Sequence, residues 1–335
     1  MVIAMLVMLL LITMLSSLCI GATGTSFFSV IGNLLTGSSS TSATIIIFEI
    51  RLPRMILGVL VGSSLAVSGA VMQGLFRNPL ADPGLVGVSA GASLAAVSVI
   101  VLGTSILAPV AALLGKYMLP FAAFGGGLIT TIILYTIATR RGQTSVATML
   151  LGGIALAALA GALSGVLIYI SDDLQMRDLI FWQMGSLGGA TWEKIGISAP
   201  FILLSFMVIP LIGSGLNALV LGEAEAKYMG VRVQLLKRAI ILMVACSVGA
   251  CVAVSGAIGF IGIVVPHLLR LLIGPDHRYI LPASALLGAS LLLVADSVSR
   301  VVVAPAELPI GIVTAALGGP FFLWILLRQR SILDL

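Results

Sequence analysis

Few residues in this chain combine a reactive type with a spacing that could support chemistry. Asp296 is the main carboxylate within a long apolar run. An ionisable group in such a run is costly to bury and is a functional candidate by default. Arg300 follows four residues later, on the same face of a helix. This spacing favours a local ion pair. A proton-coupled carrier would usually show more buried carboxylates or histidines, which argues against that class.

The chain has 2 histidines, His267 and His277, which could be suspected as haem or metal ligands. Neither has a second ligand nearby at the spacing of a metal site. His277 follows Asp276, and we expect it to lie in an exposed loop. The sequence therefore predicts neither a metal site nor a cofactor bound by this chain.

Catalytic motifs are also absent from the sequence. No nucleophile–base pair stands out, and the phosphate-binding motif GxxxxGK[ST] does not occur. We expect no enzymatic activity and no catalytic residue. If the chain takes part in ATP-driven transport, the ATPase must be a separate chain.

A short run of good helix formers lies between Gly222 and Gly230, and it carries the charged residues Glu223, Glu225 and Lys227. The two glycines are typical of a helix start and a C-cap. The run lies in the longest polar segment that we expect on the inner side. An exposed helix of this kind could dock a partner, and a solvated connecting helix explains the composition equally well.

Two segments that contain proline and glycine interrupt apolar sequence, 78–84 (NPLADPG) and 304–311 (APAELPIG). Proline removes a backbone donor and breaks a helix, so the chain must turn here or line a wet cavity. Both segments are candidate gates or docking loops.

The elements that must position these residues are membrane helices. Of the 335 residues, 60% are hydrophobic and only 9% are charged, whereas soluble domains carry about 25% charged residues. We predict an all-α polytopic membrane protein with a single transmembrane domain over 1–335. A span needs about 20 apolar residues, which predicts spans at 2–22, 55–75, 84–103, 119–138, 146–170, 196–214, 238–257, 258–273, 280–299 and 311–328.

The basic residues indicate the orientation of the chain. They lie almost wholly between apolar runs, so the net charge of +5 indicates topology rather than nucleic-acid binding. An even number of spans puts both termini on one side. If that side is cytoplasmic, the inner segments hold the larger group, Arg77, Arg140, Arg141, Lys227, Arg232, Lys237, Arg238, Arg270, Arg278, Arg328 and Arg330, and the outer segments hold Arg51, Arg54, Lys116, Arg177, Lys194 and Arg300.

The N-terminal apolar stretch, 2–22, could be taken for a signal peptide. No Lys or Arg precedes it, and it is longer than the apolar region of a typical signal peptide. We therefore expect a retained first membrane helix.

A weak internal repeat suggests two halves. Ser-Gly-Ala occurs at 68–70 and 255–257, about five predicted helices apart. An odd number of helices per half would give two inverted five-helix halves, at about 1–190 and 191–335. Elsewhere, Gly161 and Gly165 have the spacing of closely packed membrane helices.

Seven short motifs occur in a fixed order along the chain: RLPR (51–54), SGAVMQ (68–73), NPLADPG (78–84), GAIGFIG (256–262), PH (266–267), GPDHR (274–278) and ELPIG (307–311). Together they resemble the FecCD-type permeases of iron-chelate, haem and cobalamin uptake systems, which are type II ABC importers. The resemblance extends from about residue 45 to about residue 328. The runs 304–309 and 318–324 (GGPFFLW) are most similar to haem permeases.

This resemblance implies a homodimer of permeases in the bacterial inner membrane, two cytoplasmic ATPases and a periplasmic binding protein. It implies a cytoplasmic gate at Asn78, Leu80, Thr144 and Ser145. It also implies ATPase coupling through Gly222, Glu223, Glu225, Lys227 and Gly230. Arg51, Arg54 and Arg300 would face carboxylates of the binding protein, which fits docking by charge pairing.

The resemblance favours haem as the transported substrate. A ferric siderophore or cobalamin remains the alternative, because permeases for all three share these motifs. A stand-alone secondary transporter with inverted repeats is a further hypothesis, and the scarcity of buried titratable groups in the sequence argues against it.

Overall fold

The computed structural model describes residues 1–20, 44–141 and 143–333. Within these ranges the regular elements are helices, apart from one antiparallel hairpin. In chain order they are α1 (Val2–Cys19), the π-helix η1 (Ile46–Arg51), α4 (Leu52–Phe76), the 3-10 helix η2 (Pro83–Val86), α5 (Val88–Leu102), α6 (Ala108–Leu114), the 3-10 helix η3 (Gly115–Tyr117), α7 (Met118–Ala138), β1 (Thr139–Arg140), β2 (Gln143–Thr144), α8 (Val146–Tyr169), α9 (Asp173–Gln183), α10 (Trp192–Met207), α11 (Ile209–Leu221), α12 (Glu223–Tyr228), α13 (Val233–Ser255), α14 (Ile261–Ile273), α15 (His277–Val301) and α16 (Ile310–Leu333).

Every predicted span has a helical counterpart in the described residues. Six helices are long and apolar enough to cross a membrane, and the bent pair of α10 and α11 makes a seventh. The remaining predicted spans are the shorter apolar helices Val88–Leu102, Ile261–Ile273 and Ile310–Trp324. The prediction of a polytopic all-α membrane protein is therefore confirmed. Residues 21–22 of the first predicted span, and most of the polar segment that follows it, lie outside the described residues.

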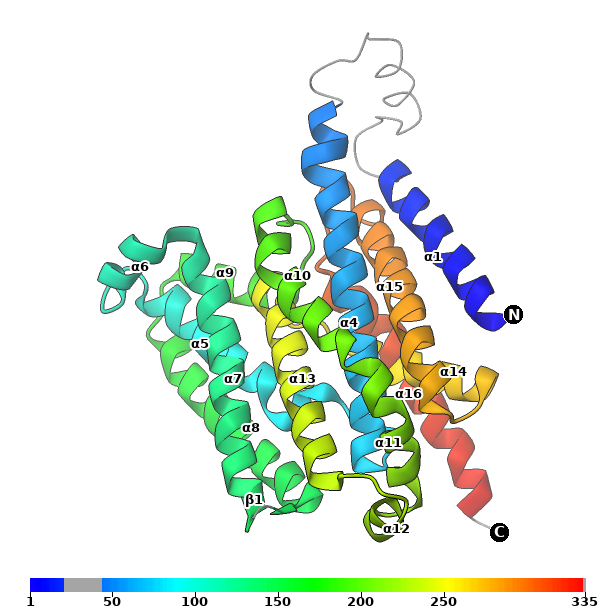
Figure 1. Ribbon diagram of the computed structural model, residues 1–335. Coiled ribbons are helices and arrows are strands. Elements are labelled where there is room, and N and C mark those ends of the chain that lie inside the picture. Colours follow the sequence, from blue (N-terminus) through cyan, green and yellow to red (C-terminus); the bar gives the residue numbers. More distant parts are fainter. Residues whose placement is uncertain (21–43, 142, 334–335) are drawn as a thin grey trace.

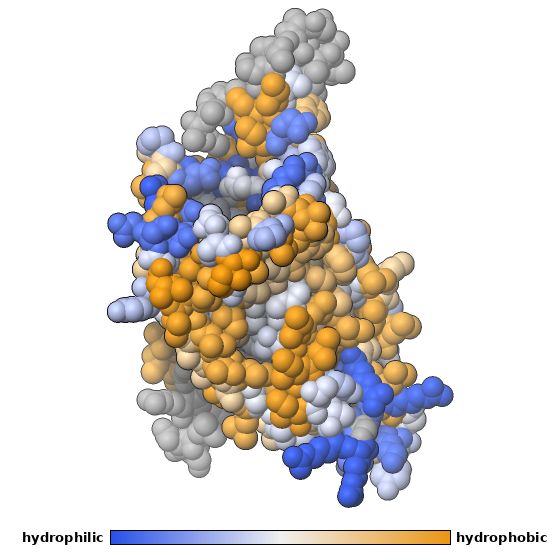
Figure 2. Space-filling view, turned by 90° about the vertical axis from the view of Figure 1, so that its left-hand side faces the viewer, coloured by the Kyte–Doolittle hydropathy of each residue, from blue (hydrophilic) through white to orange (hydrophobic). Residues whose placement is uncertain are grey.

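The surface of the molecule is divided as a membrane protein requires. Figure 2 shows a broad hydrophobic band across the middle of one face, with hydrophilic residues gathered above and below it. Exposed large side chains on α7 and α8, two of the helices on the side that Figure 2 faces, include Ile129, Ile133, Leu151, Ile154 and Leu163. Burying such side chains in lipid removes apolar surface from water, so this band is where we expect the bilayer to lie.

The two ends of the molecule carry different elements (Figure 1). The hairpin β1–β2, the short helix α12 and the C-terminal end of α16 lie together at one end, here called the α12 end. Helix α6, the C-terminal end of α1 and the start of α4 lie at the other, here called the α6 end. Segments expected on one side of the membrane therefore gather at one end.

The centre of the bundle is built on α4, α13 and α15. In α4, 83% of the apolar window is buried, compared with 11% in α8 at the periphery. A Cβ atom added to Gly62 of α4 would lie 2.5 Å from the carbonyl oxygen of Gly288 in α15. Small residues thus let the two backbones approach closely, as membrane helices require. Gly161 and Gly165 differ, because a Cβ added to either would meet no atom within 4 Å beyond its chain neighbours and the backbone of its own helix.

Two predicted boundaries are corrected. The span predicted at 196–214 is a longer pair of helices, α10 and α11, bent by 52° near Pro210, which lacks the amide hydrogen that would bridge the break. The spans predicted at 238–257 and 258–273 are separated by residues 256–260 without helix. Gly256 has a φ of 69° and Phe260 a φ of 68°. Neither value is compatible with an α-helix, so α13 ends before Gly256 and α14 begins after Phe260.

Candidate functional site

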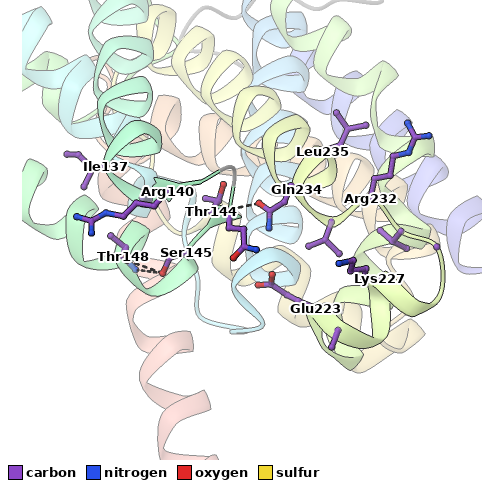
Figure 3. Close-up of a pocket in the computed structure, with 16 residues that line it drawn as sticks. Ile137, Arg140, Thr144, Ser145, Thr148, Glu223, Lys227, Arg232, Gln234 and Leu235 are labelled. Carbon is purple, nitrogen blue, oxygen red and sulfur yellow. Dashed lines mark hydrogen bonds between the residues drawn. The ribbon is translucent and has the colours of Figure 1, made fainter.

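Five residues singled out from the sequence line one open pocket at the α12 end (Figure 3). The volume of the pocket is about 1100 Å³. The five residues are Thr144, Ser145, Glu223, Lys227 and Gly230. They come from the hairpin, the start of α8 and the α12 segment. The structure therefore brings together two groups of residues that the sequence resemblance assigned to two separate roles.

The hairpin β1–β2 places the threonine of this pocket. Thr139 pairs with Thr144, and their hydroxyl oxygens lie 3.0 Å apart. Thr144 is buried, whereas Ser145 is exposed. The Ser145 hydroxyl caps α8 by accepting a hydrogen bond from the Thr148 amide at 3.2 Å. This cap satisfies a backbone donor at the helix start, so the hairpin and α8 begin as one unit.

A buried lysine joins α12 to the hairpin. The Nζ atom of Lys237 lies 2.7 Å from the Glu223 carboxylate and donates to the Thr144 carbonyl oxygen at 2.8 Å. The Lys237 side chain is 2% exposed and that of Glu223 is 43% exposed. One turn earlier in α13, the side-chain oxygen of Gln234 accepts a hydrogen bond from the Thr144 amide at 2.9 Å. Helix α13 therefore holds both backbone polar groups of Thr144.

Sequence reasoning missed the place of Lys237. It was treated as an inner basic residue before an apolar run that begins at 238. Helix α13 begins at Val233, so Lys237 lies within the helix and faces the protein interior. A burial of this kind has no local signal in the sequence, because its acceptors lie on α12 and the hairpin.

The two glycines that bracket α12 have the expected role. Gly222 precedes the helix with φ of 134°, and Gly230 follows it with φ of 84°. Side chains are disfavoured in this region of the backbone map, so glycine defines both ends. Gly222 and Glu225 lie beside the pocket without lining it, and Glu225 is exposed.

The Asn78 loop lies apart from this pocket. Arg77 ends α4 with φ of 51°, and the Asn78 side-chain oxygen then accepts from the Leu80 amide at 2.9 Å. Asn78 is exposed and Leu80 is half-buried. Further along, Asp82 accepts from the Gly84 amide at 2.7 Å. Burial raises the pKa of the Asp82 carboxyl, and that hydrogen bond opposes the effect.

A cluster of four charged residues lies at the α6 end, formed by Arg54, Asp296, Arg300 and Glu307. Arg54 lies 2.9 Å from Asp296 and also 2.9 Å from Glu307. Arg300 lies 3.2 Å from the other Asp296 oxygen. The Asp296 and Arg54 side chains are 1% and 7% exposed. The predicted Asp296–Arg300 pair is thus confirmed, and Arg54 and Glu307 extend it into a network.

The same end of the molecule also fixes the end of α1. Arg300 donates to the carbonyl oxygen of Ile20 at 2.9 Å and to that of Ser17 at 3.2 Å. Arg51 donates to the carbonyl oxygen of Leu18 at 2.7 Å. The last carbonyls of a helix lack intrahelical partners and carry partial negative charge, so guanidinium groups are favourable there.

The three arginines expected to dock a partner are therefore buried. Arg51, Arg54 and Arg300 are each at most 6% exposed and donate to acceptors within this chain. Docking to a binding protein would suggest exposed guanidinium groups, and the structure shows buried ones. Their role here is to join α1, α4 and α15, and a docking role stays a prediction.

His277 is not in an exposed loop, as the sequence had suggested. It begins α15 and is 3% exposed. Its Nδ1 atom lies 2.9 Å from the Asn217 side-chain oxygen, and the Asn217 amide donates to Asp276 at 2.6 Å. This bond and the one from the Arg278 amide hold the pKa of Asp276 below its usual value. Within the described ranges no group of three or more His, Cys, Asp or Glu side chains could hold a metal ion.

Comparisons with known proteins agree on one family. The model of the FecCD transport family matches residues 9–328. The hemin transport system permease protein HmuU of Yersinia pestis is 49% identical, over 97% of this chain and 95% of its own. The cobalamin import system permease protein BtuC of Halobacterium salinarum is 42% identical, over 87% of this chain and 75% of its own.

A solved structure gives the same result. It is described as an inward-facing conformation of a metal-chelate type ABC transporter, and it superposes with a TM-score of 0.84. It is 34% identical, over 97% of this chain and 98% of its own. The family match over most of the chain, these relatives and the polytopic helical fold lead to one conclusion. This chain belongs to the FecCD transport family, as a permease of ABC importers.

Proposed function

We propose that this chain carries haem across the bacterial inner membrane as the permease subunit of an ATP-driven importer. Haem is preferred because the hemin relative is 49% identical, whereas the cobalamin relatives are 41–42% identical. A ferric siderophore or cobalamin is the alternative substrate.

The observation that carries the proposal is the pocket at the α12 end. A partner bound to the exposed residues of α12 would lie against the same pocket as Thr144 and Ser145. A short distance between a docking helix and a candidate gate is what an ATP-driven permease needs. ATP hydrolysis takes place on another protein, and its effect must reach the membrane path.

The partners follow from this arrangement. Two cytoplasmic ATPase subunits bind the α12 segments of two permease copies, and a periplasmic binding protein delivers the substrate. The α12 end lies in the cytoplasm, and both chain termini are on the cytoplasmic side. The exposed small-residue face of α8, with Gly161 and Gly165 open, supports close contact with a second copy.

Transport in this scheme depends on two gates that do not open together. ATP binding closes the ATPase pair and moves the α12 segments with it. The permease halves then rock between outward-facing and inward-facing forms, and Asn78, Leu80, Thr144 and Ser145 form the cytoplasmic gate. The chain itself supplies a path and the gate, while the ATPase supplies the free energy.

Docking of the binding protein is proposed at the α6 end, with a condition that the structure adds. Arg54 is buried, but its partner Glu307 is 41% exposed. A carboxylate of the binding protein would reach Arg54 by displacing Glu307. Docking at Arg51 and Arg300 would similarly require release of the α1 carbonyl oxygens.

The test is uptake into proteoliposomes that contain the permease with its ATPase and binding protein. Haem, a ferric siderophore and cobalamin are compared, and an ATPase variant unable to hydrolyse ATP is the control. We expect ATP-dependent accumulation of haem. Accumulation of only another substrate would overturn the haem assignment, and uptake independent of ATP would favour a secondary transporter.

Orientation is tested separately in a variant without native cysteines. Tyr228 in α12 is 92% exposed, and Ile106 before α6 is 77% exposed. We expect a membrane-impermeant maleimide to label Tyr228→Cys from the cytoplasmic side only and Ile106→Cys from the periplasmic side only. The reverse pattern would invert the proposed topology.

A further inference from the structure

We infer that Lys237 is a positioning residue that transmits movement of α12 to the hairpin β1–β2 and the start of α8. The inference rests on the proposed function, because movement of α12 matters only if an ATPase binds it. It goes further by naming the contact through which the movement would pass.

The contacts of Lys237 connect three elements through one atom. Its stem is fixed in α13, and its Nζ atom binds Glu223, the first residue of α12, and the carbonyl oxygen of Thr144 in β2. Burial of an ammonium group is costly unless both charge and hydrogen bonds are satisfied. Because Glu223 supplies the opposite charge, a displaced α12 would leave Lys237 buried with only the neutral acceptor.

Glu223 has no substitute within the pocket. Among the described residues that line it, Glu223 is the one acidic side chain, and Arg140, Lys227 and Arg232 are basic. Figure 3 shows Glu223 and Lys227 on the α12 segment, facing the hairpin and α13 across the pocket. A Lys237 ammonium that loses Glu223 therefore meets no second carboxylate there, so the two groups must move together or separate at a large cost.

The attachment at the other side is equally specific. Thr144 is held by Lys237 at its carbonyl and by Gln234 at its amide, and the next residue, Ser145, caps α8. A shift of Lys237 therefore acts on the backbone between the hairpin and α8. Gln234 keeps the hairpin in register if Lys237 is lost, so removal of the lysine should weaken transmission without unfolding the hairpin.

The first experiment measures haem molecules transported per ATP hydrolysed by the complete importer in proteoliposomes. Lys237→Met removes both contacts at similar side-chain length, and Lys237→Arg keeps a donor for each acceptor. The matched control is Arg238→Met, at the adjacent and exposed position of α13. We expect Lys237→Met to lower the ratio at least about fivefold with ATP hydrolysis retained, Lys237→Arg to restore it largely, and Arg238→Met to leave it unchanged.

A second experiment needs no transported substrate. Spin labels are placed at the exposed positions Arg140 and Tyr228, in the permease–ATPase complex, and their separation is measured with and without a non-hydrolysable ATP analogue. We expect one narrow distance that is the same in both states, because α12 and the hairpin move together. With Lys237→Met the distribution should broaden or change with nucleotide.

The outcomes separate the two proposals. An unchanged ratio and an unchanged distance distribution in Lys237→Met would overturn the positioning role. Absence of ATP-dependent uptake by the unaltered importer with haem, siderophore or cobalamin would instead overturn the proposed function. A loss of the folded complex in Lys237→Met, with the same loss in Lys237→Arg, would show that the lysine is needed for folding only.

Discussion

The two ends of the molecule use buried charge in different ways. At the α6 end, the four-charge cluster joins two arginines to two carboxylates, and Asp296 has a cation on each of its oxygens. At the α12 end, Lys237 has one carboxylate and one neutral carbonyl oxygen. The first arrangement is redundant, whereas the second depends on a single ion pair.

This difference separates a fixed joint from a movable one. Guanidinium groups bind carboxylates through several donors in a fixed plane, and an ammonium group is a point charge on a flexible stem. Asp296 is almost fully buried, while the Glu223 carboxylate is close to half exposed and stays partly hydrated. We therefore expect the α6 end to stay in place during transport, whereas at the α12 end α12, Lys237 and the hairpin move together.

The largest effect should come from Arg54→Met. It leaves Asp296 with one cation and Glu307 with none of its described partners, and breaking a buried ion pair costs about 3–5 kcal/mol. We expect a large fall in the melting temperature of the purified permease. The melting temperature is measured by tryptophan fluorescence. Arg177→Met, at an exposed position of α9, should change it little.

A double-mutant cycle sharpens this prediction. Arg54→Met combined with Asp296→Asn should destabilise by less than the sum of the two single changes, because each single change already breaks the ion pair that the two residues share. Additive losses of stability would mean that Arg54 and Asp296 do not stabilise each other. The α6 end would then not be the more strongly coupled end of the molecule.

A smaller loss of stability is expected from Lys237→Met. Glu223 can be hydrated after the change, so the cost is that of an unpaired carbonyl oxygen, about 1–3 kcal/mol. High salt should weaken the Glu223–Lys237 coupling more than the Arg54–Asp296 coupling, because only Glu223 reaches solvent. The two coupling energies are measured by thermal unfolding of the single and double variants at low and high salt. Equal losses at the two ends would contradict the comparison.

The smallest effect should be at Asp82, a half-buried carboxylate that accepts from a backbone amide and has no ion pair among the described residues. Its folded pKa lies above the unfolded value of about 3.9, so ionisation destabilises the folded state at higher pH. Asp82→Asn should therefore raise the melting temperature at pH 8, and the gain should shrink as the pH falls toward about 4. A loss of stability at pH 8 would show that the carboxylate is needed in its charged form.

Only part of the candidate site could be predicted from the sequence, because only part of it has a local sequence signal. The α12 segment was found because glycines bracket a run of helix formers, which is a local signal. The family resemblance assigned Thr144 and Ser145 to a gate, and only the tertiary structure placed them in the same pocket as the α12 residues. Asn78 and Leu80 were assigned with them, yet the structure places them outside this pocket.

The amino-acid sequence by itself determined the membrane class, the apolar segments that form helices and the family. Each span is a local property, because about 20 apolar residues must satisfy their own backbone groups in lipid. Only the tertiary structure decided which charges are buried. Arg54 meets Asp296 across 242 residues and Lys237 meets Thr144 across 93. A charged residue at the end of an apolar run has the same local pattern whether it faces water or a distant partner, and packing alone distinguishes the two.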